Sequence, residues 1–174
     1  MKRIIVSGFG GQGVISLGLM LSYAAMKENL NTSFLPSYGP EMRGGTANCS
    51  VVISESEVAS PVISRPDILV AFNEPSLARF LPKLAEGGRV FAASSAKEEY
   101  LAGGNVCVVP VHELCGNNQK GQNIVMLGAV LSQASLSYKS AEEAVREVFK
   151  RKPQFVEANL CCLKAGYEFA KGLK

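Results

Sequence analysis

A short apolar run that stops at closely spaced glycines constrains this chain more than any other feature. The run Ile4–Ser7 is followed by Gly8-x-Gly10-x-x-Gly13, and an apolar pattern with helical spacing begins at Val14. This order is typical of the strand, loop and helix that open a nucleotide-binding α/β fold. In such a fold Gly8 would allow a tight turn off the strand, Gly10 the approach of a phosphate, and Gly13 close packing of the helix on the sheet.

The same stretch predicts an anion at the N–H groups of Gly10–Val14, because a helix start offers free donors and a positive dipole end. A dinucleotide site usually adds an Asp or Glu about 20 residues later, at the end of the second strand. The expected second strand, Thr32–Leu35, has no carboxylate after it, and Glu28 falls in the turn before it. Standard NAD is therefore disfavoured. Two readings stay open: another phosphate-bearing ligand, or glycines that serve packing alone.

The composition narrows the class of protein. A chain of 174 residues predicts one domain, residues 1–174, with a sizeable core. The hydrophobic fraction of 47% and the mean hydropathy of +0.14 indicate surface reserved for partner subunits. A scattered net charge of +3 argues against nucleic acid as a partner. No apolar run approaches the roughly 20 residues that span a bilayer, and the chain starts directly with a strand, so we expect no membrane contact and a cytoplasmic location.

The cysteines do not predict a metal or iron–sulfur site. Five are present, at positions 49, 107, 115, 161 and 162, and none forms a C-x-x-C pair. We therefore expect reduced thiols that mostly pack in the core, with no metal-binding residue in this chain. The one histidine, His112, follows an expected strand and is assigned to a strand end or loop, and no nucleophile–base pair points to catalysis.

Strand and helix patterns alternate along the chain. This order predicts a single-domain, Rossmann-like α/β fold: an open, mostly parallel sheet with helices on both faces and a helical C-terminal part. We expect a buried central strand at Asp67–Phe72, which is almost continuously apolar. The other expected strands are at about 3–7, 32–35, 49–54, 89–92 and 105–111, and the expected helices are at about 11–27, 73–84, 123–134, 141–150 and 153–171. Ser140 to Glu143 reads as a capping box, and Asn73 as a helix cap.

Ligands of open α/β sheets bind at the carboxyl ends of the strands. Three loops should meet there: Gly8–Gly13, Ser37–Asn48 and Asn73–Pro75. The second loop is too long and too polar for a plain connector. Its Arg43 offers a planar fork for a phosphate or a carboxylate. A surface loop that holds only an internal Glu41–Arg43 pair is the simpler alternative.

These motifs together resemble the γ subunit of the 2-oxoacid:ferredoxin oxidoreductases, a family with pyruvate, 2-oxoglutarate, 2-oxoisovalerate and indolepyruvate enzymes. The resemblance covers essentially the whole chain. It rests on the segments Gly8–Val14, Ser37–Gly45, Val51–Ser54 and Asp67–Asn73, and on Asn123 with Leu127-Gly128. The variant Met42 with Thr46-Ala47-Asn48 is closer to the 2-oxoglutarate and branched-chain enzymes than to the pyruvate enzymes.

The resemblance implies a subunit of an oxidoreductase that converts a 2-oxo acid, coenzyme A and oxidised ferredoxin to acyl-CoA, carbon dioxide and reduced ferredoxin. Thiamine diphosphate and 4Fe-4S clusters would belong to α, β and δ partner chains, and ferredoxin would meet the complex through them. Coenzyme A is the candidate ligand of this chain. No residue of the chain is expected to be catalytic. The candidate binding residues are Gly8, Gly10, Gly11, Gln12, Gly13, Tyr38, Arg43, Gly44, Gly45 and Asn73.

Two alternatives remain at this stage. One is a stand-alone nucleotide-binding oxidoreductase with an unusual ribose contact, although the chain shows no convincing catalytic set. Tyr23 and Lys27 have the Tyr-x-x-x-Lys spacing, but they fall at the far end of the first helix from the ligand edge. The other is a purely structural γ subunit whose glycine loops touch only other subunits.

Overall fold

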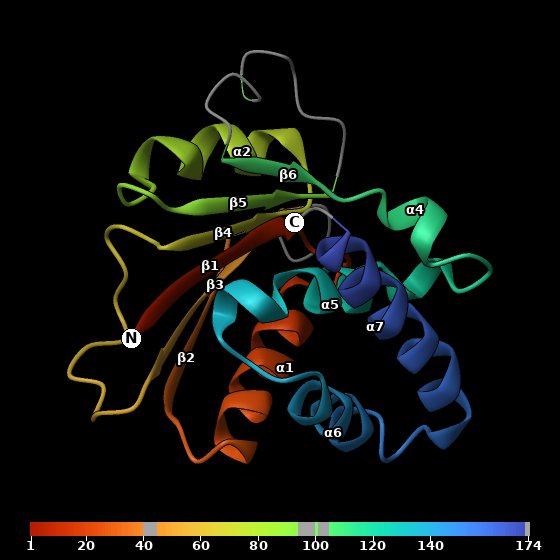
Figure 1. Cartoon of the computed structure of the whole chain (residues 1–174). Helices are drawn as coiled ribbons and strands as arrows, with labels where there is room; N and C mark the ends of the chain where they lie inside the picture. Colours follow the sequence, from red (N-terminus) through yellow and green to blue (C-terminus); the bar gives the residue numbers. More distant parts are fainter. Residues whose placement is uncertain (40–44, 94–99, 101–104, 173–174) are drawn as a thin grey trace.

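A six-stranded sheet in the order β2-β3-β1-β4-β5-β6 forms the centre of the fold (Figure 1). The computed structural model describes residues 1–39, 45–93, 100 and 105–172. β4 lies between two parallel neighbours and all of its residues are buried, as its apolar sequence predicts. The strands are β1 (Lys2–Phe9), β2 (Asn31–Tyr38), β3 (Thr46–Ser54), β4 (Ile68–Ala71), β5 (Arg89–Ala92) and β6 (Val106–Val108).

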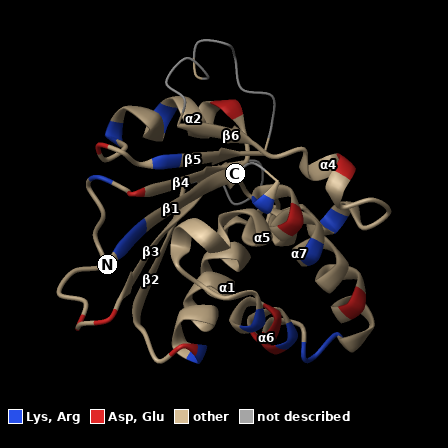
Figure 2. Cartoon of the chain, viewed as in Figure 1, with Lys and Arg blue, Asp and Glu red and all other residues tan. Residues whose placement is uncertain are grey.

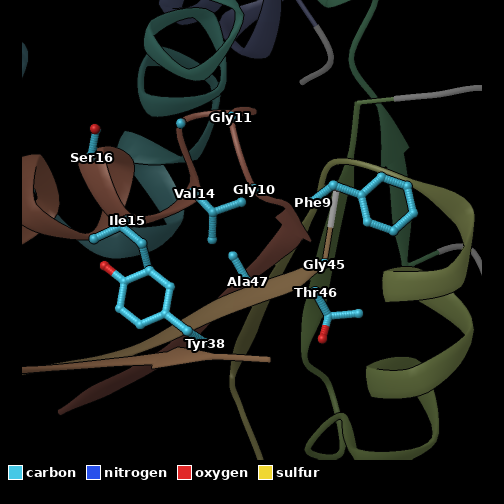
Figure 3. A pocket seen from close by; sticks show the side chains of 11 residues that line it. Phe9, Gly10, Gly11, Val14, Ile15, Ser16, Tyr38, Gly45, Thr46 and Ala47 are labelled. Carbon is cyan, nitrogen blue, oxygen red and sulfur yellow. The ribbon is translucent and has the colours of Figure 1, made fainter. Parts of the chain in front are cut away.

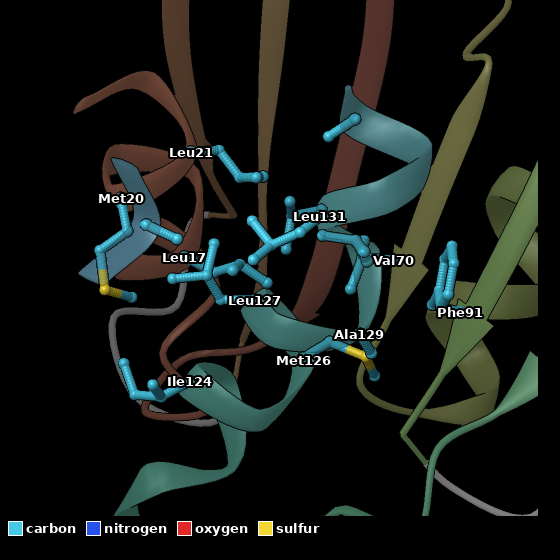
Figure 4. Packing of buried hydrophobic residues seen from close by; sticks show 14 of the residues in the cluster. Leu17, Met20, Leu21, Val70, Phe91, Ile124, Met126, Leu127, Ala129 and Leu131 are labelled. Atoms are coloured by element: carbon cyan, nitrogen blue, oxygen red, sulfur yellow. The ribbon is translucent and has the colours of Figure 1, made fainter. Parts of the chain in front are cut away.

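Helices cover the two faces of the sheet unequally. On one face, Leu77 and Phe80 of α2 pack on β1, β4 and β5 in a small apolar cluster. The larger core lies on the other face, under α1, α5, α6 and α7 (Figures 1 and 4). The helices are α1 (Val14–Lys27), α2 (Glu74–Phe80), α4 (Val111–Leu114), α5 (Gln122–Ala134), α6 (Tyr138–Val148) and α7 (Val156–Lys171), with 3-10 turns at Leu81–Lys83, Gln119–Gly121 and Pro153–Phe155.

The strand pairing confirms the predicted open, mostly parallel sheet and adds an antiparallel part. The pairs β1–β4, β4–β5 and β5–β6 are parallel. β3 is antiparallel to both β1 and β2. β2 continues to Tyr38 and β3 starts at Thr46, so the predicted loop Ser37–Asn48 is the connection of a hairpin, and its two ends are strand.

Two predicted helix starts are wrong. The first helix begins at Val14 and not near Gly11, because Gly11 and Gly13 have φ angles of 95° and 77°. Ser140 does not cap α6: the cap is Ser137, whose Oγ accepts the N–H of Ser140 at 3.1 Å. The hydroxyl of Ser140 instead donates to Oε1 of Glu28 at 2.5 Å.

The end of the sheet is also shorter than expected. β6 stops at Val108, and Val111–Leu114 forms α4, so His112 lies on an exposed helical turn and not at a strand end. By contrast, the predicted cap of α2 is confirmed, since Oδ1 of Asn73 accepts the N–H of Ser76 at 2.9 Å.

α5 is the central helix of the core and has an unusually close neighbour. Ten of its 13 residues are buried, so it is apolar on nearly every side (Figure 4). Gly128 of α5 and Gly166 of α7 let the two backbones meet. A Cβ on Gly128 would overlap the carbonyl of Leu163, and one on Gly166 would overlap the carbonyl of Val125.

We predict that Gly166→Ala destabilises the fold by about 1–3 kcal/mol, because the added methyl group forces the two helices apart. Urea unfolding measures this change. Gly172→Ala is the matched control at the end of the same helix, where the nearest atom to a new Cβ lies at 3.5 Å. Equal stability of the Gly166→Ala variant and the control would contradict the close packing.

Arg3 and Asp67 tie the starts of β1 and β4 together. Oδ2 of Asp67 accepts the backbone N–H and Nε of Arg3 at 2.8 and 3.1 Å, and Oδ1 accepts Nη2 at 2.7 Å. Burial raises the pKa of the Asp67 carboxyl, but the hydrogen bonds and charge of Arg3 outweigh it, and the pKa is lowered.

A lowered folded-state pKa stabilises the fold above the unfolded pKa of about 3.9, and this contribution disappears as the pH falls through the folded pKa. We therefore predict that Asp67→Asn costs about 1 kcal/mol at neutral pH, a value discounted for solvent screening because the pair is about one-third exposed. The difference from the wild type should shrink below about pH 4 in urea unfolding. Glu168→Gln, in an exposed pair with Lys164, is the control and should change little.

Candidate functional site

A pocket of about 340 Å³ opens at the carboxyl ends of β1 and β2, where the structure brings two of the predicted loops together (Figure 3). Its walls come from the end of β1, the first turn of α1, and both sides of the β2–β3 hairpin. It is lined by Phe9, Gly10, Gly11, Gly13, Val14, Ile15, Ser16, Tyr38, Gly45, Thr46 and Ala47. The volume is at the lower end of the range of small-molecule sites.

The glycines of this loop serve packing as well as shape. Gly8 lies within β1, and a Cβ there would come within 2.9 Å of Gln12, Val14 and Phe72. Its predicted role as a turn residue is therefore wrong: it lets the loop fold back on the strand. Gly13 was expected to bring the helix close to the sheet. Gly13 instead has a left-handed φ and faces α5, where a Cβ on Gly13 would lie 2.5 Å from the side chain of Asn123. The glycine of α1 that lies against the sheet is Gly18, which faces Cys49 of β3.

Three hydrogen-bonded contacts hold the loop in place. The N–H of Gly10 donates to the carbonyl of Gly45 at 2.9 Å, which joins the loop to the β2–β3 hairpin. Nδ2 of Asn123 donates to the carbonyl of Gly13 at 3.4 Å, which joins it to α5. The third contact, made by Gln12, joins it to the end of β4.

Gln12 connects the loop to the start of α2. Its Oε1 accepts the N–H of Phe9 at 2.6 Å and Nδ2 of Asn73 at 3.0 Å, and its Nε2 donates to the carbonyl of Phe72 at 3.4 Å. Neither Gln12 nor Asn73 lines the pocket. Because their polar groups bond to protein, both residues position the loop, which the glycine spacing alone could not indicate.

The helix start leaves backbone donors without helical partners beside the pocket. The first bond of α1 runs from Leu17 to the carbonyl of Gly13, no side chain caps the helix, and no acidic residue stands in its first turn. The N–H groups of Val14, Ile15 and Ser16 are therefore outside the helical bonding pattern. Gly10 and Gln12 were predicted to offer their N–H groups too, but they donate to Gly45 and Phe9.

Among the described residues, any positive character at this site comes from the backbone. No charged residue occurs between Arg3 and Lys27, and Figure 2 shows α1 without charged side chains until its C-terminal end. The aligned peptide dipoles of α1 supply a partial positive charge at its N-terminus. Such a site favours a phosphate or another anion.

The strand order explains the missing ribose carboxylate. In a dinucleotide fold the second strand lies next to the first, and its end reaches the ribose. Here β3 lies between β1 and β2, and Gly8 and Tyr38 both pair with Ala47. The residue at the end of β2 is thus two strands away from the glycine loop, and it is a tyrosine.

The structure brings half of the predicted binding residues into the pocket. Gly10, Gly11, Gly13, Tyr38 and Gly45 line it, whereas Gly8, Gln12 and Asn73 support it from outside. Arg43 and Gly44, like Glu41 and Met42, lie outside the described residues. The lining residues that sequence reasoning missed are Phe9, Val14, Ile15, Ser16, Thr46 and Ala47. No pattern in the sequence indicates the antiparallel register of β3, which brings Thr46 and Ala47 to the pocket.

The thiols do not form a metal site in the part of the chain that the structure describes. All five cysteines are free, and no group of three or more His, Cys, Asp and Glu among the described residues could hold a metal ion. Burial raises the pKa of Cys49, under α1, to about 12, so this thiol is neutral at physiological pH. No helix of the described ranges is long and apolar enough to cross a membrane.

The fold and the pocket first define a class: a Rossmann-like α/β domain with a glycine loop at the carboxyl edge of its sheet. The chain belongs to the pyruvate ferredoxin/flavodoxin oxidoreductase family, whose model matches residues 3–169. This confirms the family that the loop motifs resemble.

Two curated relatives are similar over nearly the whole chain. Ketoisovalerate oxidoreductase subunit VorA of Methanothermobacter thermautotrophicus is 42% identical over 175 aligned positions, and the alignment covers 97% of this chain and 36% of VorA. The chain thus spans about a third of that relative. 2-Oxoglutarate synthase subunit KorC of Methanocaldococcus jannaschii is 33% identical over 180 aligned positions, and the alignment covers 99% of this chain and 95% of KorC.

Solved structures agree with the family. The γ subunit of a keto/oxoacid ferredoxin oxidoreductase from Geobacter sulfurreducens has a TM-score of 0.77 at 28% identity, with 99% of each chain covered. A 2-oxoglutarate:ferredoxin oxidoreductase from Magnetococcus marinus, with 2-oxoglutarate, coenzyme A and succinyl-CoA bound, has a TM-score of 0.88 at 23% identity. This match covers 100% of the present chain and 32% of that one, and it shows the fold alone.

We predict that Gln12→Ala destabilises the chain by about 1–3 kcal/mol, because it leaves the N–H of Phe9 and the amide of Asn73 without their acceptor. Thermal and urea unfolding measure the effect. Gln154→Ala, at an exposed position, should change stability by less than about 0.5 kcal/mol. If both variants unfold like the wild type, Gln12 does not hold the loop.

Proposed function

We propose that this chain is the γ subunit of a 2-oxoacid:ferredoxin oxidoreductase. The complex would convert a 2-oxo acid and coenzyme A to an acyl-CoA and carbon dioxide, with reduction of ferredoxin. The family membership and the full-length likeness to a γ subunit support this proposal. Its substrate stays open between 2-oxoglutarate and a branched-chain 2-oxo acid, the classes named for the KorC and VorA relatives.

In this proposal the carbon chemistry belongs to partner subunits. Thiamine diphosphate and 4Fe-4S clusters would be bound by α, β and δ chains, which also carry the contact with ferredoxin. The donor set of this chain does not fit a cluster, because its cysteines lack paired spacing and Cys49 is deeply buried. The domain 1–174 would dock against those chains at a cytoplasmic location.

The role we propose for the pocket is to hold phosphates of coenzyme A. The observation that carries this role is the uncapped start of α1, whose first turn lines the pocket and lacks an acidic residue. The N–H groups of Gly11, Val14 and Ser16 would donate to phosphate oxygens. Arg43 and Gly44 remain proposed contacts from the second loop, where a guanidinium fork would add a charge-assisted bond.

The likeness to a structure with coenzyme A bound is consistent with this role. A nicotinamide dinucleotide fits less well, because β3 separates the end of β2 from the glycine loop. The alternative stand-alone oxidoreductase is therefore disfavoured.

We predict that Ser16→Asp weakens the binding of coenzyme A to the full chain about tenfold, because it puts a negative charge beside the phosphate. A tenfold change corresponds to about 1.4 kcal/mol. The same change should not lower thermal stability, since an acidic residue in the first turn stabilises a helix. Calorimetric titration and thermal unfolding give the two values.

Ser16→Asn is the neutral control of similar size and should keep most of the affinity. A wild-type chain that binds no coenzyme A, or equal affinities for the Asp and Asn variants, would overturn the proposed role. Binding of NAD in the low micromolar range would favour the stand-alone alternative.

A further inference from the structure

The connection between α6 and α7 concentrates positive charge. Residues 1–134 contain ten Lys and Arg and ten Asp and Glu, whereas residues 135–174 contain eight and five, so the net charge of +3 belongs to the C-terminal helices. Three of these eight cations are consecutive: Lys150, Arg151 and Lys152. All three are exposed, and Figure 2 shows a basic segment between the two helices.

The turn that carries these cations has a defined backbone. The N–H of Lys152 donates to the carbonyl of Phe149 at 2.8 Å, and the N–H of Phe155 donates to the carbonyl of Lys152 at 3.0 Å. Phe149 before the turn and Val156 after it pack against the large core. The exposed cations therefore stand on a turn that is held on both sides.

The nearby acidic residues are bound to other cations. Glu142 and Glu157 both pair with Arg146, at 2.9 and 3.5 Å. Glu147 pairs with Lys150. In the described part of the chain, no carboxylate pairs with the other two cations of the turn. Arg151 and Lys152 are thus open to an anion from outside.

Lys152 also stands where a helix disfavours a cation. It directly precedes the 3-10 turn Pro153–Phe155, which leads into α7. The start of a helix has a partial positive charge, so a lysine there opposes the dipole. An external anion at this point would offset both the dipole and the two unpaired cations.

Phe155 adds an apolar surface beside the cations. Its side chain is 47% exposed, and it belongs to neither apolar cluster of the core. Aromatic and arginine side chains are enriched at protein interfaces. A partner that fits here has carboxylates opposite Arg151 and Lys152 and an apolar residue against the ring of Phe155.

We propose that residues 150–155, the basic turn, bind an acidic surface on a partner subunit of the oxidoreductase complex. The inference rests on the proposed function and names a contact through which this chain joins the complex. A nucleic acid fits less well, because three adjacent cations neutralise few phosphates. A membrane fits less well too, since the basic clusters that bind anionic lipids have about four to eight cations.

The test measures the binding of the full chain to the α and β subunits of the complex by sedimentation, at low and at high salt. In the double variant Arg151→Glu with Lys152→Glu, the dissociation constant at low salt should rise about tenfold or more, because two attractions become repulsions. Salt should weaken the wild type more than the variant. Thermal unfolding of the variant should not be lowered, since an acidic residue at the start of α7 favours the helix.

Phe155→Ala separates the apolar contact from the charges. It should weaken binding about tenfold and keep the salt dependence of the wild type, because it removes no charge. Lys120→Glu with Lys139→Glu is the matched control: it changes the net charge equally, at two exposed lysines outside the basic turn. This control should keep most of the affinity.

Each contrary result has a distinct meaning. Unchanged binding in the charge-reversed variant, or an equal loss in the control, would overturn the proposal. Self-association of the wild type that the reversal abolishes, with subunit binding intact, would show a second copy of this chain as the occupant. Binding to tRNA or to phosphatidylserine vesicles that the reversal alone abolishes, again with subunit binding intact, would assign the turn to nucleic acid or membrane. A wild-type chain that binds neither subunit would refute the proposed function itself, and this contact with it.

Discussion

The structure depends on one unusual pairing, that of β3 against β1. Because β3 runs antiparallel to both neighbours, the β2–β3 hairpin reaches the same edge of the sheet as the glycine loop. The carbonyl of Gly45 can then accept the N–H of Gly10, and the wall that contains Tyr38 stands opposite α1. In an all-parallel sheet a crossover helix would separate these segments. The hairpin thus supplies half of the pocket and displaces the position from which a dinucleotide fold would hold a ribose.

A second set of contacts makes the loop part of the rigid core. Gln12 joins it to the start of α2, and Asn123 joins it to α5, the most buried helix. Asn73 serves two partners at once, since its amide donates to Gln12 while its Oδ1 caps α2. Polar groups with several partners fix one geometry better than apolar contacts do. The loop is therefore shaped before any ligand arrives, which limits the ordering that binding would require.

Sequence reasoning predicted the fold class, a central strand at Asp67–Phe72, which the structure has at Ile68–Ala71, and the cap at Asn73, because each depends on a local pattern of apolar or capping residues. It failed where the local structure depends on contacts between residues that are far apart in the sequence. Gly13 faces Asn123, 110 positions away, and Ser140 gives its hydroxyl to Glu28, 112 positions away. The site was predicted in part for the same reason: glycines mark the loop, but only the register of β3 brings Ala47 and Thr46 to it.

The lack of charged residues from Ile4 to Met26 has a consequence for how this surface responds to its surroundings. Backbone amides do not gain or lose protons between acid and alkaline conditions, so a pocket built from them keeps its polarity across that range. Any pH dependence of binding there will report the ionisation of the guest rather than of this wall. The donors themselves also survive most single substitutions, because changing a side chain leaves the N–H groups in place. Only changes that alter the path of the main chain can remove these donors.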